Sequence, residues 1–476
     1  MTTYFVMERP LAWWPPSAAS SKLNGMRIVY LAAGAAGMYC GSCLHDNTLA
    51  AGLLELGQDV LLVPTYTPLR TDENNVSLAR VFYGGINVYL QQKSSFFRNT
   101  PWLVDRLFDQ PALLDFVARR GASTDPAKLG DLTVSMLAGE SGRQKKELDK
   151  LLAWLAAEAR PDVVHLSNSM LLGMAGQIAD RLRVPVLSTL SGEDIFLEKL
   201  AEPHYSRARE LLRSRAQHVN AFVALNDYYA GFMSDYLDVP RSSIHVIPHG
   251  LRLDGHHLRD HRPADELTIG YFARVCHDKG LHLLAAALPL LAADSRLPKL
   301  KLRAAGYLGA GDREYLHQVR QSLAAAGLTD RFHYVGEVDR QGKIDFFHSI
   351  DVMSVPTVYR ESKGISILEA LANGVPVVQP AHGAFPEMLS DTQGGLLFTP
   401  HDAGDLAEKL ARLLTDHTLR QDLGRAGHFA INDRYHHRAM AARTLALYQH
   451  VLAADTQSDD AAREQTAVAA GKRETQ

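Results

Sequence analysis

Short runs of apolar, largely β-branched residues alternate with segments of helical spacing along most of the chain. The runs read MRIVYLAA, DVLLV, DVVHLS, VPVLSTL, AFVALN and SIHVIP in the first half, then LTIGYFA, LKLRAAG, FHYVGEV, DVMSVP and VPVVQP in the second. Runs that are apolar on both faces and separated by helices are typical of parallel sheets covered by helices on both sides. The sequence therefore predicts an α/β protein with two Rossmann-like parallel-sheet domains. Ligands of such sheets bind beyond the carboxyl ends of the strands, so two facing sheets predict a deep cleft.

The length of 476 residues favours two domains over one. A polar, histidine-rich segment from Gly250 to Leu267 is the best linker, so we expect a first domain over residues 26–255 and a second over residues 256–430. Outside them we expect a flexible extension at residues 1–25, a final helix at 431–455 and a disordered, alanine-rich tail at 456–476.

Charge and composition exclude some classes of function. Lys and Arg number 50 against 53 Asp and Glu, so the chain does not resemble a general nucleic-acid binder and any anion site must be local. No apolar run reaches the roughly 20 residues that span a bilayer, and the first residues lack the pattern of a secretory signal. Three cysteines fit a reducing compartment. We expect a cytoplasmic protein without a transmembrane segment; contact with a membrane surface stays open.

The segment ESKGISILEALANGVPVV places Glu361 and Glu369 around the start of a short helix that ends near Asn373. Two adjacent hydroxyls of a ribose would satisfy both oxygens of Glu369, and Glu361 could serve sugar hydroxyls in the same way. The alternative is that both carboxylates are solvated. The helix start also offers unpaired backbone N–H groups to a phosphate, at Gly364, Ile365 and Ser366.

A pair of cations begins the second domain, where the strand LTIGYFA leads into Arg274 and Lys279. Arg grips phosphate with two hydrogen bonds and Lys adds a compact charge, so the pair suits a diphosphate. The alternative is two solvated cations. Cations near a helix start are electrostatically disfavoured, which favours a nearby anion.

The ordered set FARVCHDKG, RAAGYLG, YVGEV, ESKGISILEALANGVPVV and HGAFPEM resembles the C-terminal domain of retaining glycosyltransferases of family four, which have the GT-B fold. The resemblance covers nearly all of residues 26–455. It implies a last helix that packs back across the first domain. It also implies transfer of a hexose-type sugar from a nucleotide-diphosphate sugar to an acceptor hydroxyl, with retention, by a metal-independent front-face mechanism and without a cofactor.

The resemblance also implies roles for single residues. Arg274 and Lys279 would hold the donor diphosphate, and the N–H groups of residues 364–366 would meet its distal phosphate. Glu369 would bind the ribose and Glu361 the transferred sugar, so that Glu361, Arg274 and Lys279 are the catalytic candidates. Family members commonly have Gly and an aromatic residue where this chain has Ser362 and Lys363. Lys363 could be an extra contact, but we expect it to face solvent.

The acceptor side has five candidates. They are Gly37, His165, Ser191, Glu193 and Asp194. Gly37 lies in a glycine-rich loop after the first strand, and the strand DVVHLS resembles the family's strand that ends in a histidine, which places His165 near the cleft. Ser191 stands where family members often have His, and we expect one of the two carboxylates after it to cap a helix and the other to face the acceptor.

The first-domain loop also contains Cys40-Gly-Ser-Cys43. A local metal site and a redox pair are alternatives to two thiols that line a substrate loop.

Other functions stay open at this point. A GT-B nucleotide-sugar epimerase or phosphorylase would share the cleft, and a non-catalytic nucleotide-sugar-binding protein would share the donor site. The acceptor could be a sugar, a lipid-linked group or a small molecule, and nothing in the sequence selects the nucleobase of the donor.

Overall fold

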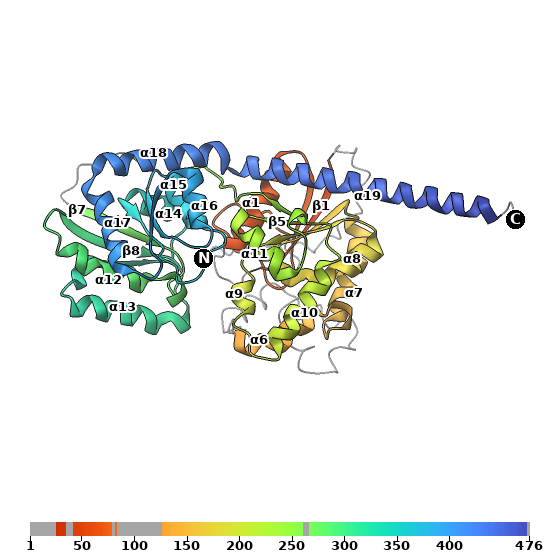
Figure 1. The fold of residues 1–476 in the computed structure, drawn as a ribbon, viewed down its shortest axis with the longest axis horizontal. Helices are drawn as coiled ribbons and strands as arrows, with labels where there is room; N and C mark the ends of the chain where they lie inside the picture. Colours follow the sequence, from red (N-terminus) through yellow and green to blue (C-terminus); the bar gives the residue numbers. More distant parts are fainter. Residues whose placement is uncertain (1–24, 35–40, 79–80, 83–125, 260–265, 474–476) are drawn as a thin grey trace, which may run out of the picture.

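The computed structural model describes residues 25–34, 41–78, 81–82, 126–259 and 266–473. Figure 1 shows two α/β domains side by side, with a pair of long helices running along one side of both. Within the described residues, no helix is long and apolar enough to cross a membrane.

The first domain contains a six-stranded sheet in the order β2-β1-β3-β4-β5-β6, and every neighbouring pair is parallel. Its strands are β1 (Arg27–Ala32), β2 (Asp59–Pro64), β3 (Val163–Leu166), β4 (Val186–Leu190), β5 (Ala221–Ala224) and β6 (Ile244–Val246). Val29 and Leu31 of β1 point into one apolar core, and Ile28 and Tyr30 into another on the opposite face. Both faces of the sheet are therefore buried, as its continuous apolar runs predict.

The second domain repeats this plan in the order β12-β11-β10-β7-β8-β9, again with all pairs parallel. Its strands are β7 (Glu266–Phe272), β8 (Lys299–Ala305), β9 (Phe332–Gly336), β10 (Val352–Met353), β11 (Val377–Pro380) and β12 (Gly395–Phe398). The predicted fold class is confirmed. The sequence pattern missed β12, because this edge strand begins at a glycine and three of its four residues are only half-buried.

Helices cover both sheets. In the first domain the described helices are α1 (Gly41–Glu55), α6 (Pro126–Leu137), α7 (Lys145–Trp154), α8 (Ala175–Leu182), α9 (Asp194–Leu197), α10 (His204–Ala216) and α11 (Asp227–Leu237). In the second they are α12 (Leu281–Ala292), α13 (Arg313–Ala325), α14 (Arg340–His348), α15 (Ile365–Ala372), α16 (Phe385–Thr392), α17 (Ala403–Thr415) and α18 (His417–Arg434).

The chain crosses between the domains at two places that lie side by side. The outgoing segment at Leu251 pairs with the returning segment at His436: Leu251 N–H donates to the Tyr435 carbonyl at 2.7 Å, and His437 N–H to the Leu251 carbonyl at 2.8 Å. The approach is so close that a Cβ on Gly250 would lie 2.4 Å from the His436 carbonyl oxygen. Only glycine fits there without displacing the crossing.

The last helix, α19 (His437–Arg473), returns to the first domain (Figure 1). Met440, Ala441, Tyr448 and Val451 join the core beneath β1, so the helix packs on the first sheet as expected. Residues 456–473, which the sequence predicts to be a disordered tail, continue this helix. The difference has a simple cause, because the alanine-rich composition that lacks an apolar period also has a high helix propensity.

Candidate functional site

The site lies where the strand order of the second sheet changes direction. Strands β7 and β10 are neighbours, but the chain proceeds from β7 to β8 on one side and from β10 to β11 on the other. The loops after β7 and β10 therefore diverge and leave a crevice at their carboxyl ends. Arg274 and Lys279 follow β7, and Glu361 follows β10. The topology thus brings together residues that are more than 80 positions apart in the sequence.

A cavity of about 440 Å³ extends from this crevice to the first domain. Its size is within the range of small-molecule sites. From the first domain it is lined by Gly41, Leu44, Arg70, Asp72, Ser191 and Gly192, and from the second by Arg274, Lys279, Tyr307, Glu361, Ser366 and Glu369, among others. Both domains are needed to form it.

Helix α15 begins at the wall of this cavity. Gly364 precedes it with φ 63°, a backbone angle that favours glycine, and a Cβ there would lie 2.6 Å from Met388 Cε, so that side chain would have to shift. Backbone bonds to the Gly364 carbonyl start at the N–H groups of Ile367 and Leu368, at 3.0 and 3.3 Å. The N–H groups of Ile365 and Ser366 come before that ladder and line the cavity, where an anion could accept from them.

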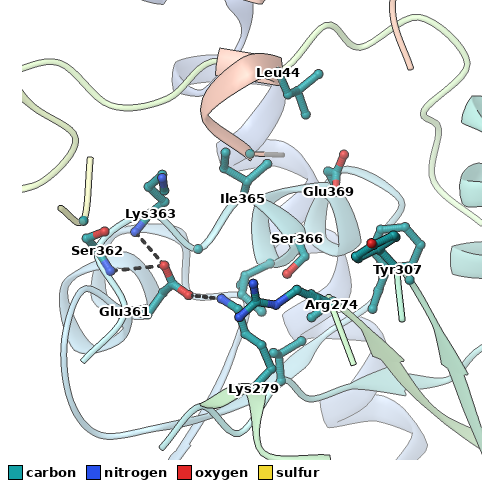
Figure 2. A pocket seen from close by; sticks show the side chains of 18 of the residues that line it. Leu44, Arg274, Lys279, Tyr307, Glu361, Ser362, Lys363, Ile365, Ser366 and Glu369 are labelled. Carbon is teal, nitrogen blue, oxygen red and sulfur yellow. Dashed lines mark hydrogen bonds and ion pairs between the residues drawn. The ribbon is translucent and has the colours of Figure 1, made fainter. Parts of the chain in front are cut away.

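Glu361 is held from both sides, as Figure 2 shows. Its Oε2 accepts from Lys279 Nζ at 2.6 Å and from the Tyr359 hydroxyl at 2.8 Å, while its Oε1 accepts from the backbone N–H groups of Ser362 and Lys363, both at 3.2 Å. Burial raises the pKa of Glu361, but the Lys279 ammonium outweighs burial and brings the pKa to about 2. The carboxylate is therefore ionised and fixed in position.

Arg274 and Lys279 reach the same cavity from the β7 loop. The Nε of Arg274 donates to Cys276 Sγ at 3.3 Å. Lys279 Nζ contacts Glu361 and also the Tyr359 hydroxyl. An ammonium has three N–H donors, so a third stays available to a ligand. The structure thus places the two cations and Glu361 around the same cavity, as the sequence predicts.

Glu369 lies on α15 and lines the cavity, but it is not free. Its Oε1 lies 2.5 Å from Lys343 Nζ of α14, and the same ammonium lies 2.5 Å from Asp72 Oδ2 of the first domain. Burial lowers the pKa of Lys343, yet the carboxylates of Glu369 and Asp72 outweigh it, so the pKa lies above its ordinary value and Lys343 is charged.

Lys363 differs from its expected place in solvent. Its side chain lines the cavity and crosses to the first domain, where Nζ donates to Ser42 Oγ at 2.8 Å. The reason is the approach of the two domains, which the local sequence does not reveal. Lys363 thus brings a positive charge to the start of α1.

The acceptor-side carboxylates also differ from expectation. Ser191 lines the cavity, whereas Glu193 is buried beside it and accepts from Ser191 N–H at 2.9 Å and Ser169 N–H at 3.2 Å. Asp194 accepts from the Tyr229 hydroxyl at 2.6 Å. Neither side chain caps α9 or lines the cavity, because neighbouring donors hold both of them inside the first domain. Glu193 can position Ser191 in the cavity wall, but neither carboxylate is exposed to the cavity itself.

His165, which the resemblance to the family places near the cleft, lies in the core instead. Its Nδ1 is 2.6 Å from the Tyr448 hydroxyl of α19, and its Nε2 is 2.8 Å from Thr189 Oγ1 of β4. Burial, and to a lesser degree His45, lowers the pKa of His165 to about 3, so the ring is neutral. It connects the sheet to the last helix, and it does not line the cavity.

Two predicted features fall outside the described residues, namely Gly37 and the first cysteine of the Cys40–Cys43 pair. Cys43 is buried in α1. In the described part of the chain, no group of three or more His, Cys, Asp and Glu side chains could hold a metal ion. The roles considered for this loop remain predictions.

Several cavity residues were missed in the sequence. Tyr359 stands only two positions before Glu361 and contacts it directly, so its position next to the motif could have indicated it. Asp72 and Lys343 gave no such signal. Each becomes a cavity residue only through the packing of one domain on the other.

Two protein families match the chain in adjoining segments. The family described as "Glycosyl transferase 4-like domain" matches residues 47–250, and the family described as "Glycosyl transferases group 1" matches residues 257–428. The boundary between the two matches coincides with the crossing from the first sheet to the second.

Two individual relatives of the chain also have the names of glycosyltransferases. The D-inositol 3-phosphate glycosyltransferase of Kribbella flavida is 28% identical over 72% of this chain and 85% of its own length. The phosphatidyl-myo-inositol mannosyltransferase of Mycobacterium leprae is 35% identical over 30% of this chain and 37% of its own length.

Solved structures share the fold. The sucrose-phosphate synthase of Thermosynechococcus elongatus has a TM-score of 0.67 at 18% identity, covering 90% of this chain and all of that one. Anabaena Alr3699/HepE, solved in complex with UDP and glucose, has a TM-score of 0.61 at 17% identity, covering 89% of this chain and all of that one. The two adjoining family matches and this fold show that the chain belongs to the glycosyltransferases with the GT-B fold and is similar to those of family four.

Proposed function

We propose that the protein transfers a hexose-type sugar from a nucleotide-diphosphate sugar to an acceptor hydroxyl with retention of the anomeric configuration. The observation that carries the proposal is the convergence of Arg274, Lys279, Glu361 and the start of α15 on one cavity between the domains. Cations and unpaired N–H groups suit a diphosphate, and a fixed carboxylate suits sugar hydroxyls.

In this mechanism the acceptor oxygen forms a bond to the anomeric carbon on the face from which the nucleoside diphosphate leaves. The bond from the anomeric carbon to the leaving oxygen breaks through an oxocarbenium-like transition state, and a leaving phosphate oxygen accepts the acceptor's proton. Arg274, Lys279 and the N–H groups of residues 365–366 would stabilise the negative charge that develops on the phosphate. Protein cations supply this charge, so we propose that the reaction needs neither a metal ion nor another cofactor.

Glu361 would contact the transferred sugar. Its two oxygens are already oriented by Lys279, Tyr359 and two backbone N–H groups. These four donors match the roughly four lone-pair sites of a carboxylate, so a sugar hydroxyl would take the place of one of them. A carboxylate fixed in this way can accept from a sugar hydroxyl without having to be ordered first.

For the acceptor we propose a polyol that carries a phosphate. Both relatives above are named for inositol acceptors with a phosphate, one free and one within a lipid. The charge of Lys363 at the first-domain wall gives such a phosphate a partner. A free inositol phosphate and a lipid-linked one both offer a polyol with a phosphate, so this proposal covers both.

The test is a transfer assay on the purified full chain. Labelled sugar conjugates of uridine, guanosine and adenosine diphosphates are mixed with inositol phosphate, with phosphatidylinositol vesicles or with myo-inositol. We expect a glycosylated product with the donor's anomeric configuration by NMR, and full activity in EDTA. Isomerised nucleotide sugar, or sugar phosphate formed with inorganic phosphate, would point to an epimerase or a phosphorylase. Binding without any turnover would point to a non-catalytic module, and a product of opposite configuration would overturn retention.

A further inference from the structure

The first domain contributes a charged segment to the donor side of the cavity. Residues 70–73 follow β2 and form three ion pairs with the second domain: Arg70 with Glu337 at 2.7 Å, Asp72 with Lys343 at 2.5 Å, and Glu73 with Arg340 at 3.6 Å. Arg70 and Asp72 also line the cavity, while Glu73 does not. The segment therefore spans the two domains at the place where a donor would lie.

This segment is fixed to the first domain as well. Thr48 of α1 donates from Oγ1 to Glu73 Oε2 at 2.8 Å, and Asn47 donates from Nδ2 to the Asn74 carbonyl at 3.0 Å. Asn47 also accepts from Val76 N–H at 2.9 Å. These bonds fix the segment, and with it Asp72, to α1 of the first domain.

Lys343 links this segment to the carboxylate that would bind the ribose. Its ammonium is shared by Asp72 Oδ2 and Glu369 Oε1, each at 2.5 Å, and all three side chains are nearly buried. Lysine has a long flexible stem, so two anchors define the position of its Nζ much better than one. With Asp72 in place, Lys343 holds one oxygen of Glu369 and leaves the second to a ligand.

We propose that Asp72 is a positioning residue for donor recognition: through Lys343 it orients Glu369 toward the ribose hydroxyls, so that the ribose subsite is completed by the first domain. The inference rests on the proposed function, because it takes Glu369 as the ribose contact. Without Asp72, Lys343 would move onto Glu369 and occupy the oxygens that the ribose needs. Recognition of the ribose therefore depends on contact between the two domains.

The test compares nucleotides with and without ribose hydroxyls. Dissociation constants are measured by calorimetry on the full chain for UDP, GDP and ADP, and then for the 2′,3′-dideoxy form of whichever binds most tightly. The readout is the ratio of the two constants, which a general loss of stability would not change selectively. Wild-type protein should prefer the ribose form by about tenfold or more, the effect of a hydrogen bond to a charged group. Asp72→Asn and Lys343→Met should each reduce this preference to within about threefold of unity.

Matched variants separate the alternatives. Glu73→Gln removes the neighbouring ion pair between the domains without reaching Lys343, so it should retain the wild-type ratio. Asp72→Glu keeps the charge and should restore most of the preference. Should Asp72→Asn fail to fold, Lys343→Met and Asp72→Glu still decide the question from the two sides of the ion pair.

The outcomes also distinguish the inference from the function it rests on. If wild-type protein prefers the ribose form and Glu369→Gln abolishes that preference, an unchanged ratio in Asp72→Asn and Lys343→Met overturns the inference alone. If wild-type protein binds none of the three nucleotides, or Glu369→Gln keeps the wild-type ratio, the assignment of the donor site itself is wrong.

Discussion

The Lys279 ammonium and the Glu361 carboxylate lie 2.6 Å apart inside the interdomain cavity. Neither group is a simple surface charge: Glu361 is only 6% exposed, the Lys279 side chain is 23% exposed, and two backbone N–H groups hold the other oxygen of Glu361. A cation proposed for the leaving phosphate and a carboxylate proposed for the sugar are thus parts of one network. A change in one of them should alter how the other is placed.

Replacement of Glu361 by Gln should lower kcat far more than it weakens binding of the nucleotide. The amide removes the charge opposite Lys279 and its NH₂ group turns a donor toward other donors. We expect kcat to fall by about 10²–10³-fold, comparable to the loss of one preorganised electrostatic contact. The measurement is initial rate against donor concentration. Glu408→Gln, at an exposed position on α17, serves as the control. If kcat of the Glu361 variant equals that of this control, the assignment of Glu361 to the transferred sugar is wrong.

Replacement of Lys363 by Met should weaken the use of a phosphorylated acceptor selectively. The loss of one charge-assisted contact predicts an acceptor KM that rises by about tenfold or more, with the donor KM unchanged. Lys199→Met is a suitable control, because Lys199 also crosses between the domains, to Asp278 at 2.6 Å, but does not line the cavity. Equal effects of the two variants, or an effect on myo-inositol as large as on its phosphate, would count against a phosphate contact at Lys363.

The buried pair His45 and His249, whose Nδ1 atoms lie 2.9 Å apart, should make stability fall in acid. Burial, together with Lys363, lowers the pKa of His45 from 6.5 to about 3. Below pH 6.5 the unfolded chain takes up a proton that the folded chain refuses, so the free energy of unfolding declines as pH falls toward 3.

Urea unfolding at pH 7, 6 and 5 tests this effect of His45. In His45→Gln the decline should become shallower by up to about 1.4 kcal/mol per pH unit, the contribution of one proton. A variant that follows the wild-type slope over this range would show that His45 does not contribute.

Replacement of Tyr448 by Phe should destabilise the fold without a direct effect on catalysis. The variant leaves the buried Nδ1 of His165 without its partner from α19, which costs about 1–3 kcal/mol of unfolding free energy. Urea unfolding measures this loss. The value of kcat, measured about 20 degrees below the melting temperature of the variant, should be unchanged. Gln449→Ala, exposed on the same helix, provides the baseline. A kcat that falls while stability is retained would instead support a role of His165 in the reaction.

The parts of the site that the sequence predicts are the local ones. Glu361, the glycine at 364 and the start of α15 lie within one short motif, whose helix stop and apolar spacing determine its backbone. Arg274 and Lys279 follow from strand order, because β7 and β10 are neighbours at the point where that order changes direction. In these cases the chemistry depends on residues close in sequence or on the general topology of parallel sheets.

The parts that the sequence does not predict depend on contacts between distant segments. His165 lies near the carboxyl end of β3, but Tyr448 of α19, 283 positions later in the sequence, binds its ring in the core. Lys343 and Lys363 have no local signal, because their partners Asp72 and Ser42 belong to the other domain. Glu193 and Asp194 follow a strand toward the cleft, yet nearby hydroxyl and N–H donors take up their oxygens.

The paired crossing of the chain at Leu251 and His436 has a mechanical consequence. Both covalent connections between the domains pass through one narrow place and are tied there by backbone hydrogen bonds. We expect it to act as a pivot, so that the domains rotate about a single axis rather than slide apart. The ion pairs between the domains, such as Lys199 with Asp278 and Lys343 with Asp72, would have to break for the domains to rotate apart and reform when they close.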